Sequence, residues 1–229
     1  MKIYTYSERG IVNSLIYSLS EEHAKELLCS ANSELKNPED ITIYLEHSLS
    51  DFGSPDVIIT YNEGKKFIVV FVEAKVSNGN KKWSLKKQYE DFKDKKPKDI
   101  TSNIFRQFAL KELLMNNKNK AEDGISCDDK NKRIMGNKTS PRKIGNNNVV
   151  KKFFNKIKDA DDYWFLGLVP DNALPDPREK DKAVFDKLKL LTWKQIAAFA
   201  EAKGLNDLKD SFSWNNGIIY NAEEQNDNS

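Results

Sequence analysis

The chain of 229 residues contains few of the side chains that build disulfide scaffolds or soft-metal sites. It has only two cysteines, Cys29 and Cys127, and two histidines, His23 and His47. Two cysteines far apart in unlike contexts argue against a disulfide framework and against a cysteine-bound zinc ion. Neither histidine has a metal-ligand partner nearby in the sequence, which disfavours a histidine-bound metal. We therefore expect a reducing, cytoplasmic environment.

Long apolar runs and a strong excess of one charge are also missing. The longest apolar run, FIVVFV at residues 67–72, is much shorter than the roughly 20 residues that span a bilayer. The opening MKIYTYSERG becomes polar too early for a signal peptide, so we expect neither export nor a membrane segment. The net charge is only +2, so a nucleic-acid partner must be argued from local charge clusters.

The remaining composition is that of a globular chain, with 38% hydrophobic and 31% charged residues. Periodicity and turn residues predict the order helix, helix, three strands, helix, insertion, two strands, helix. The expected helices of this order cover residues 8–19, 21–36, 101–115 and 192–202, and the expected strands cover residues 41–47, 56–61, 66–76, 163–169 and 185–193. A further short helix is expected over residues 149–157, directly after the insertion. This order predicts one α/β domain over residues 1–229, with a mixed sheet flanked by helices.

Two segments have few apolar residues. Residues 116–148 are rich in Asn, Lys, Asp and Gly, which predicts a mobile surface insertion. Residues 221–229 are polar and are expected to fray.

The stretch GSPDVIITYNEGKKFIVVFVEAKV, residues 53–76, places ionisable groups in a hydrophobic hairpin. Side chains alternate along a strand, so Glu73 and Lys75 are expected on one face, with the small Ala74 between them. Antiparallel pairing through the NEG turn brings Asp56 to the same end of the sheet. Two converging carboxylates need a neutralising cation, and Mg²⁺ prefers such oxygen ligands. The pattern is typical of phosphodiester hydrolysis.

Pro55-Asp56 followed by Glu73-Ala74-Lys75 resembles the signature of the PD-(D/E)XK nuclease superfamily. The resemblance implies a restriction-endonuclease-like fold of order αα-βββ-α-ββ-α. It also implies metal ligation by Asp56, Glu73 and the Ala74 carbonyl, with Mg²⁺ as the cofactor and Mn²⁺ as a substitute.

Further roles follow from the same resemblance. Lys75 would position the attacking water or help to deprotonate it. Glu8, on the inner stripe of the first helix, would support the metal site or a second ion. Gln107, on the helix after the third strand, would orient the lysine or the phosphate, with Gln88 as a rival for that role.

Plainer interpretations of the same residues stay open. Asp56 could be a residue that caps a strand start, and Glu73 and Lys75 could form a solvated pair at a strand end. Glu8 could be an ordinary acidic residue that interacts favourably with the helix dipole, and Gln107 could be a buried amide bonded to the backbone. Asp51 could replace Asp56 as a ligand, although its place before Gly53 favours a loop role.

A basic segment, residues 81–98, follows the proposed site. Its lysines could contact phosphates, and its aromatic residues could stack on an unpaired base. Acidic residues interleave with the lysines, which is equally typical of a solvated surface. The residues proposed to bind nucleic acid are Lys81, Lys82, Trp83, Lys86 and Lys87, with Tyr89 as a second candidate aromatic.

The sequence thus predicts a Mg²⁺-dependent nuclease, with DNA favoured over RNA as substrate and with a homodimer as one possible assembly. Restriction, repair and defence are the roles that such an activity would suit. The alternative is a catalytically inactive nuclease-like module that binds nucleic acid or a protein partner.

Overall fold

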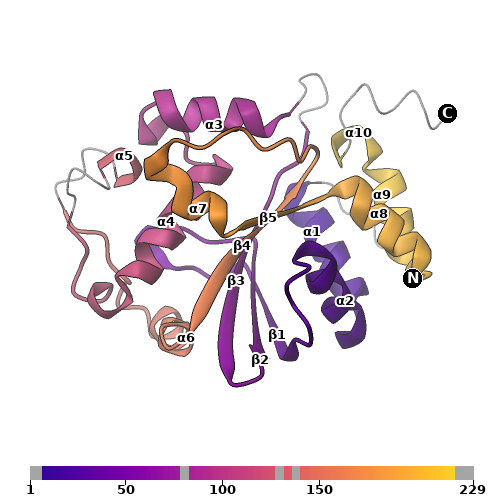
Figure 1. The fold of residues 1–229 in the computed structure, drawn as a ribbon, viewed down its shortest axis with the longest axis horizontal. Coiled ribbons are helices and arrows are strands. Elements are labelled where there is room, and N and C mark those ends of the chain that lie inside the picture. Colours follow the sequence, from indigo (N-terminus) through magenta and orange to yellow (C-terminus); the bar gives the residue numbers. More distant parts are fainter. Residues whose placement is uncertain (1–6, 78–82, 127–131, 136–139, 220–229) are drawn as a thin grey trace.

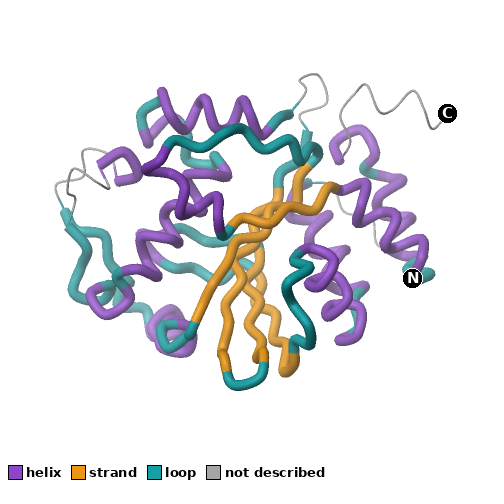
Figure 2. The backbone as a smooth tube through the Cα atoms, in the orientation of Figure 1, coloured by secondary structure: helices purple, strands orange, loops and turns teal. Residues whose placement is uncertain are grey.

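A mixed five-stranded sheet forms the centre of the molecule in the computed structural model, which describes residues 7–77, 83–126, 132–135 and 140–219 (Figures 1 and 2). The strand order is β1-β2-β3-β4-β5, in which β1 to β3 pair antiparallel and β3 to β5 pair parallel. The strands are β1 Glu39–Leu45, β2 Val57–Glu63, β3 Lys66–Ala74, β4 Asp162–Val169 and β5 Leu188–Thr192. The predicted α/β class with a mixed, helix-flanked sheet is confirmed.

Helices cover both faces of this sheet, in the two groups that Figure 1 shows on either side of the strands. One group contains α1 Glu8–Ser18, α2 Glu21–Ala31, α8 Trp193–Ala202, α9 Asn206–Trp214 and α10 Asn216–Ile219. The other contains α3 Leu85–Asp94, α4 Ile104–Asn116, α5 Lys132–Met135, α6 Asn148–Ile157 and α7 Lys182–Asp186. Among the described residues, no helix is long and apolar enough to cross a membrane.

The β2–β3 hairpin is the element that carries the proposed site. Glu63 pairs with Lys66, so Gly64 and Lys65 form the turn. Gly64 has a φ of 61°, a conformation that glycine adopts without steric cost. β3 lies between β2 and β4 and is buried along most of its length, which explains why its sequence is apolar on both faces.

Side chains of β3 alternate between the two helix layers. Val70, Val72 and Ala74 pack in the layer of α1 and α8. Val69 and Phe71 pack in the layer of α4. This alternation directs the Glu73 side chain toward α4. The two helix layers therefore contact different residues at the end of β3.

Several helices were not predicted. α3 was missed because Leu85, Tyr89 and Phe92, its buried stripe, are separated by many lysines and acidic residues. Residues 185–193, predicted as one strand, are instead the end of α7, the strand β5 and the start of α8. α9 and α10 follow Gly204, where the sequence indicated that the last helix stops.

The range 116–148 contributes to the core. Ala121, Ile125 and Ile144 are buried against the α4 layer, and Ile125 forms an isolated antiparallel bridge with Arg142. The described parts of this range are therefore packed through a few apolar anchors. Its mobility stays a prediction, and residues 221–229 lie outside the described part of the chain.

Replacement of Phe108 by alanine tests how α4 is held on the sheet. The Phe108 ring stacks on Phe165 of β4 with centroids 4.9 Å apart, and neither residue is exposed. Phe108→Ala should lower the free energy of unfolding by about 3–5 kcal/mol, the usual cost of such a cavity. Urea denaturation measures the change. Val149→Ala, at a position 67% exposed, should change it by less than about 0.5 kcal/mol, and an equal effect of both variants would contradict the packing described.

Candidate active site

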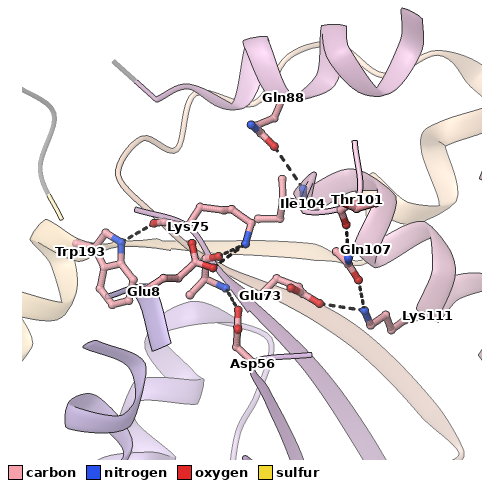
Figure 3. A network of polar contacts seen from close by, with 11 residues as sticks. Glu8, Asp56, Glu73, Lys75, Gln88, Thr101, Ile104, Gln107, Lys111 and Trp193 are labelled. Carbon is pink, nitrogen blue, oxygen red and sulfur yellow. Dashed lines mark hydrogen bonds and ion pairs between the residues drawn. The ribbon is translucent and has the colours of Figure 1, made fainter. Parts of the chain in front are cut away.

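The charged residues of the hairpin meet where β2 begins and β3 ends. Val57 pairs with Val72, so Asp56 and Glu73 are the next opposed positions of the antiparallel ladder. The Ala74 N–H donates to Asp56 Oδ2 at 2.8 Å, which fixes the Asp56 carboxylate beside the β3 backbone (Figure 3). The structure thus brings Asp56 next to Glu73 and Ala74, as the hairpin pattern predicted.

Glu73 is buried, with 4% of its surface exposed. Its Oε1 accepts a hydrogen bond from Lys111 Nζ of α4 at 3.0 Å. Burial raises the pKa of Glu73, and the attraction of Lys111 offsets this shift only in part. Burial likewise lowers the pKa of Lys111. Glu73 is therefore not the solvated strand-end residue of the plainer interpretation.

Lys75 turns to the opposite helix layer, that of α1, whereas Glu73 points toward α4. The prediction that both side chains lie on one face is therefore wrong, because β3 ends at Ala74 and strand alternation does not extend to Lys75. Its Nζ lies 3.1 Å from Glu8 Oε1 of α1 and donates to the carbonyl of Ala74. Burial alone would lower the pKa of Lys75, but the carboxylates of Glu8, Glu73 and Asp56 outweigh it and raise the pKa. Lys75 is 9% exposed and is held as a cation among three carboxylates.

Glu8 therefore contacts the site directly, and its role is more than a favourable interaction with the helix dipole. Ser7 caps α1 by accepting from the Gly10 N–H, and this cap sets the first turn of the helix. Burial raises the pKa of Glu8, against the attraction of Lys75. Because Glu8 is paired with Lys75, the Glu8 carboxylate already has a partner within the protein.

The glutamine predicted on α4 contacts a different lysine. Gln107 Oε1 accepts from Lys111 Nζ at 2.7 Å, and its Nε2 donates to the Thr101 carbonyl at 2.5 Å. Gln88 Oε1 accepts from the Ile104 N–H at 3.4 Å, at the start of α4. Of the two glutamines, Gln107 is the one joined to the carboxylate cluster, through Lys111.

Lys111 is the main site residue that the sequence analysis missed. It lies on the buried stripe of α4 between Phe108 and Met115, where the helical period predicts an apolar residue. A lysine on such a stripe, four residues after Gln107, is a signal that could have been found. A charged residue at a core position needs a buried partner of opposite sign.

Asp51 has a loop role. Its carbonyl accepts from Arg142 Nη1, and its Oδ2 accepts from the Lys143 N–H at 3.1 Å. These contacts join the 3₁₀ turn Ser50–Phe52 to the segment after residue 140. The carboxylate beside the β3 backbone is that of Asp56.

The predicted nucleic-acid segment is described only in part, since Lys81 and Lys82 lie outside the described residues. Lys86 and Lys87 are exposed on α3, and Lys87 lies 3.3 Å from Asp91. Trp83 is half-buried against the core. The prediction that Tyr89 could stack on a base is wrong, because the residue is only 2% exposed and its hydroxyl donates to Asp181 at 2.8 Å.

Backbone contacts hold Lys75 in place after the strand ends. Its N–H donates to the Leu168 carbonyl of β4 at 2.8 Å. Its carbonyl accepts from Trp193 Nε1 of α8 at 2.8 Å, and the Ser77 N–H donates to the Ile218 carbonyl of α10 at 2.6 Å. The C-terminal helices therefore position the lysine through its main chain.

The donor atoms at this site suit a hard divalent cation. The hydrogen bonds described use one oxygen of each carboxylate, Oδ2 of Asp56 and Oε1 of Glu73, which leaves a second oxygen of each for ligation. The Ala74 carbonyl adds a third oxygen, which accepts a hydrogen bond from Lys75 Nζ. In the described part of the chain, no three His, Cys, Asp or Glu side chains form a group able to hold a metal, so water or phosphate would complete the coordination.

Comparisons of the chain with protein-family models, curated proteins and solved structures found no match. The functional argument therefore depends on the residues of the site and their contacts.

Trp193→Phe tests the main-chain anchor of Lys75. Phenylalanine keeps the ring that packs edge-on against Phe212 but removes the indole donor, which leaves the buried Lys75 carbonyl unpaired. The free energy of unfolding should fall by about 1–3 kcal/mol, measured by urea denaturation. Trp214→Phe, at a position 62% exposed, is the matched control. Equal stability of the two variants would show that the anchor contributes nothing.

Glu8→Gln tests the pKa of the Glu8 carboxyl. Because burial raises this pKa above 4.5 in the folded chain, the folded state keeps its proton to higher pH than the unfolded state. The wild-type chain then loses stability as pH rises from about 4.5 through the folded pKa, and the variant lacks this loss. The free energy of unfolding of the variant relative to wild type should therefore rise over this window and then level off. A constant difference, or a fall, would contradict the shift.

Proposed function

We propose that this chain is a metal-dependent nuclease of the PD-(D/E)XK type, with a restriction-endonuclease-like fold, that hydrolyses phosphodiester bonds of DNA. The proposal is carried by one observation: Asp56 is hydrogen-bonded to the backbone of the Glu73-Ala74-Lys75 triplet at the buried end of β3. The element order is compatible with the finer fold assignment, since a helix precedes three antiparallel strands, and a helix then precedes a parallel strand.

The proposed role of each site residue follows from its charge. Asp56, Glu73 and the Ala74 carbonyl would hold Mg²⁺, which neutralises charge on the phosphate and makes a water easier to deprotonate. Lys75 is a cation in this setting, so it suits the stabilisation of negative charge on the phosphate and the orientation of the attacking water. Glu8 keeps the Lys75 ammonium at the end of the strand. In the hydrolysis, the water loses a proton as its oxygen bonds to phosphorus, the bond from phosphorus to the leaving oxygen breaks, and the leaving oxygen takes up a proton.

Substrate contacts are proposed for the start of α3 and the segment before it. Lys86 and Lys87 present exposed ammonium groups, which are suited to phosphate contacts, and Lys81, Lys82 and Trp83 belong to the same proposal. A homodimer that cuts both strands of a duplex is part of this proposal as well.

The decisive assay incubates the purified chain with supercoiled plasmid, linear duplex, single-stranded DNA and single-stranded RNA, each with Mg²⁺, Mn²⁺ or a chelator. We expect metal-dependent cleavage of DNA. Asp56→Asn and Lys75→Met should each reduce the rate by at least about 100-fold, the scale of a lost catalytic group. Lys203→Met, which removes an exposed ammonium paired with Glu26, should retain the wild-type rate.

Two results would redirect the assignment. Cleavage that persists unchanged in both site variants would place the activity elsewhere or in a contaminant. Metal-dependent binding of nucleic acid without any cleavage would instead support the inactive binding module. The ion pair of Lys111 with Glu73 is the observation that favours this second candidate, since it already occupies one carboxylate oxygen.

A further inference from the structure

Lys111 is an ammonium group enclosed by the protein. None of its surface is exposed. Its Nζ lies 3.0 Å from Glu73 Oε1 and 2.7 Å from Gln107 Oε1. A buried charge without a partner is strongly unfavourable, so the position of Lys111 is tied to the presence of Glu73.

The surroundings of Lys111 leave its ammonium little room to move. A Cβ atom built at Gly53 would lie 2.8 Å from Gln107 Oε1 and 3.2 Å from Lys111 Nζ, so the backbone before β2 closes directly over both groups. Gly53 has a φ of 87°, which favours glycine at this point. Gln107 is itself fixed by the Thr101 carbonyl. Lys111 is therefore held on the oxygen of Glu73 by Gln107 and by the backbone at Gly53.

The charges of the site can be summed without deciding where each proton lies. Glu73 with Lys111 is one pair of total charge zero, and Glu8 with Lys75 is a second. Asp56, whose Oδ2 accepts from a backbone N–H, then contributes the one uncompensated negative charge. A single divalent cation more than neutralises this cluster, and a second one would meet net repulsion.

We propose that Lys111 is a fixed counter-ion of Glu73 that restricts the site to one divalent cation and weakens its binding. This inference rests on the proposed function, because it assumes a cation between Asp56 and Glu73. It assigns Lys111 as a positioning residue, since it acts on the cation through Glu73. It also decides between the two roles foreseen for Glu8, because a carboxylate paired with Lys75 supports the site and does not bind a second ion.

The first test titrates the metal-free chain with Mn²⁺ in a calorimeter, with no nucleic acid present. The wild-type chain should bind one ion. Lys111→Met, which keeps most of the side-chain volume and removes the charge, should bind Mn²⁺ at least about tenfold more tightly, because a nearby positive charge is lost. Lys203→Met, at an exposed position, should bind as wild type does. Two ions in the wild-type chain, or an unchanged or weaker affinity in Lys111→Met, would overturn the inference.

The second test guards against a variant that folds poorly. Lys111→Met leaves Glu73 buried without its partner, so the metal-free variant should melt at a lower temperature than wild type and Mn²⁺ should restore much of the loss. The double variant Glu73→Gln with Lys111→Met removes both charges and should melt close to wild type, with no response to Mn²⁺. A double variant that melts as low as Lys111→Met would overturn the counter-ion role.

The outcomes separate this inference from the proposed function. A wild-type chain that binds no Mn²⁺ and cleaves no nucleic acid would overturn the proposed function. A wild-type chain that binds one ion and cleaves DNA, with no tighter binding in Lys111→Met, would overturn the inference alone.

Discussion

The end of β3 is covered by helices on both faces of the sheet, so water reaches little of Glu73 and Lys75, which are 4% and 9% exposed. Protein groups neutralise them instead: α4 supplies Lys111 to Glu73, and α1 supplies Glu8 to Lys75. Removing one partner from a buried pair such as Glu73 and Lys111 is much more costly than the pair is favourable. The docking of each helix and the assembly of the site are therefore parts of the same event.

The strands were predictable because their pattern is local. β3 is apolar on both faces since it is the central strand, and Gly64 marks its hairpin turn. α3 was hidden because only three of its ten residues, at helical spacing, are buried, and lysines dominate the rest. The segment 185–193 was misread because short apolar runs do not separate the last turn of a helix from a strand. Only the packing of the finished sheet makes that distinction.

The site was predictable where neighbours in the hairpin define it and not where distant elements do. Antiparallel pairing is enough to place Asp56 beside Glu73. The partner of Lys75 could be guessed, because Glu8 continues the inner stripe of α1. Lys111 is a single misplaced charge on a helix stripe, and its link to Glu73 appears only once α4 lies on the sheet. Trp193, which holds the Lys75 carbonyl, gives no local sign of that contact.

The anchoring of the segment after β3 has a consequence for how the chain is made. The main chain of Lys75 and Ser77 is bonded to Trp193 and Ile218, which the ribosome adds more than a hundred residues later. The hairpin can form early, since its contacts are local, but the lysine cannot be fixed at its end until α8 and α10 have been synthesised. Long-range contacts of this kind are formed late because their loop-closure entropy is large. A growing chain thus contains the charged residues of the site well before these residues can take up their final arrangement.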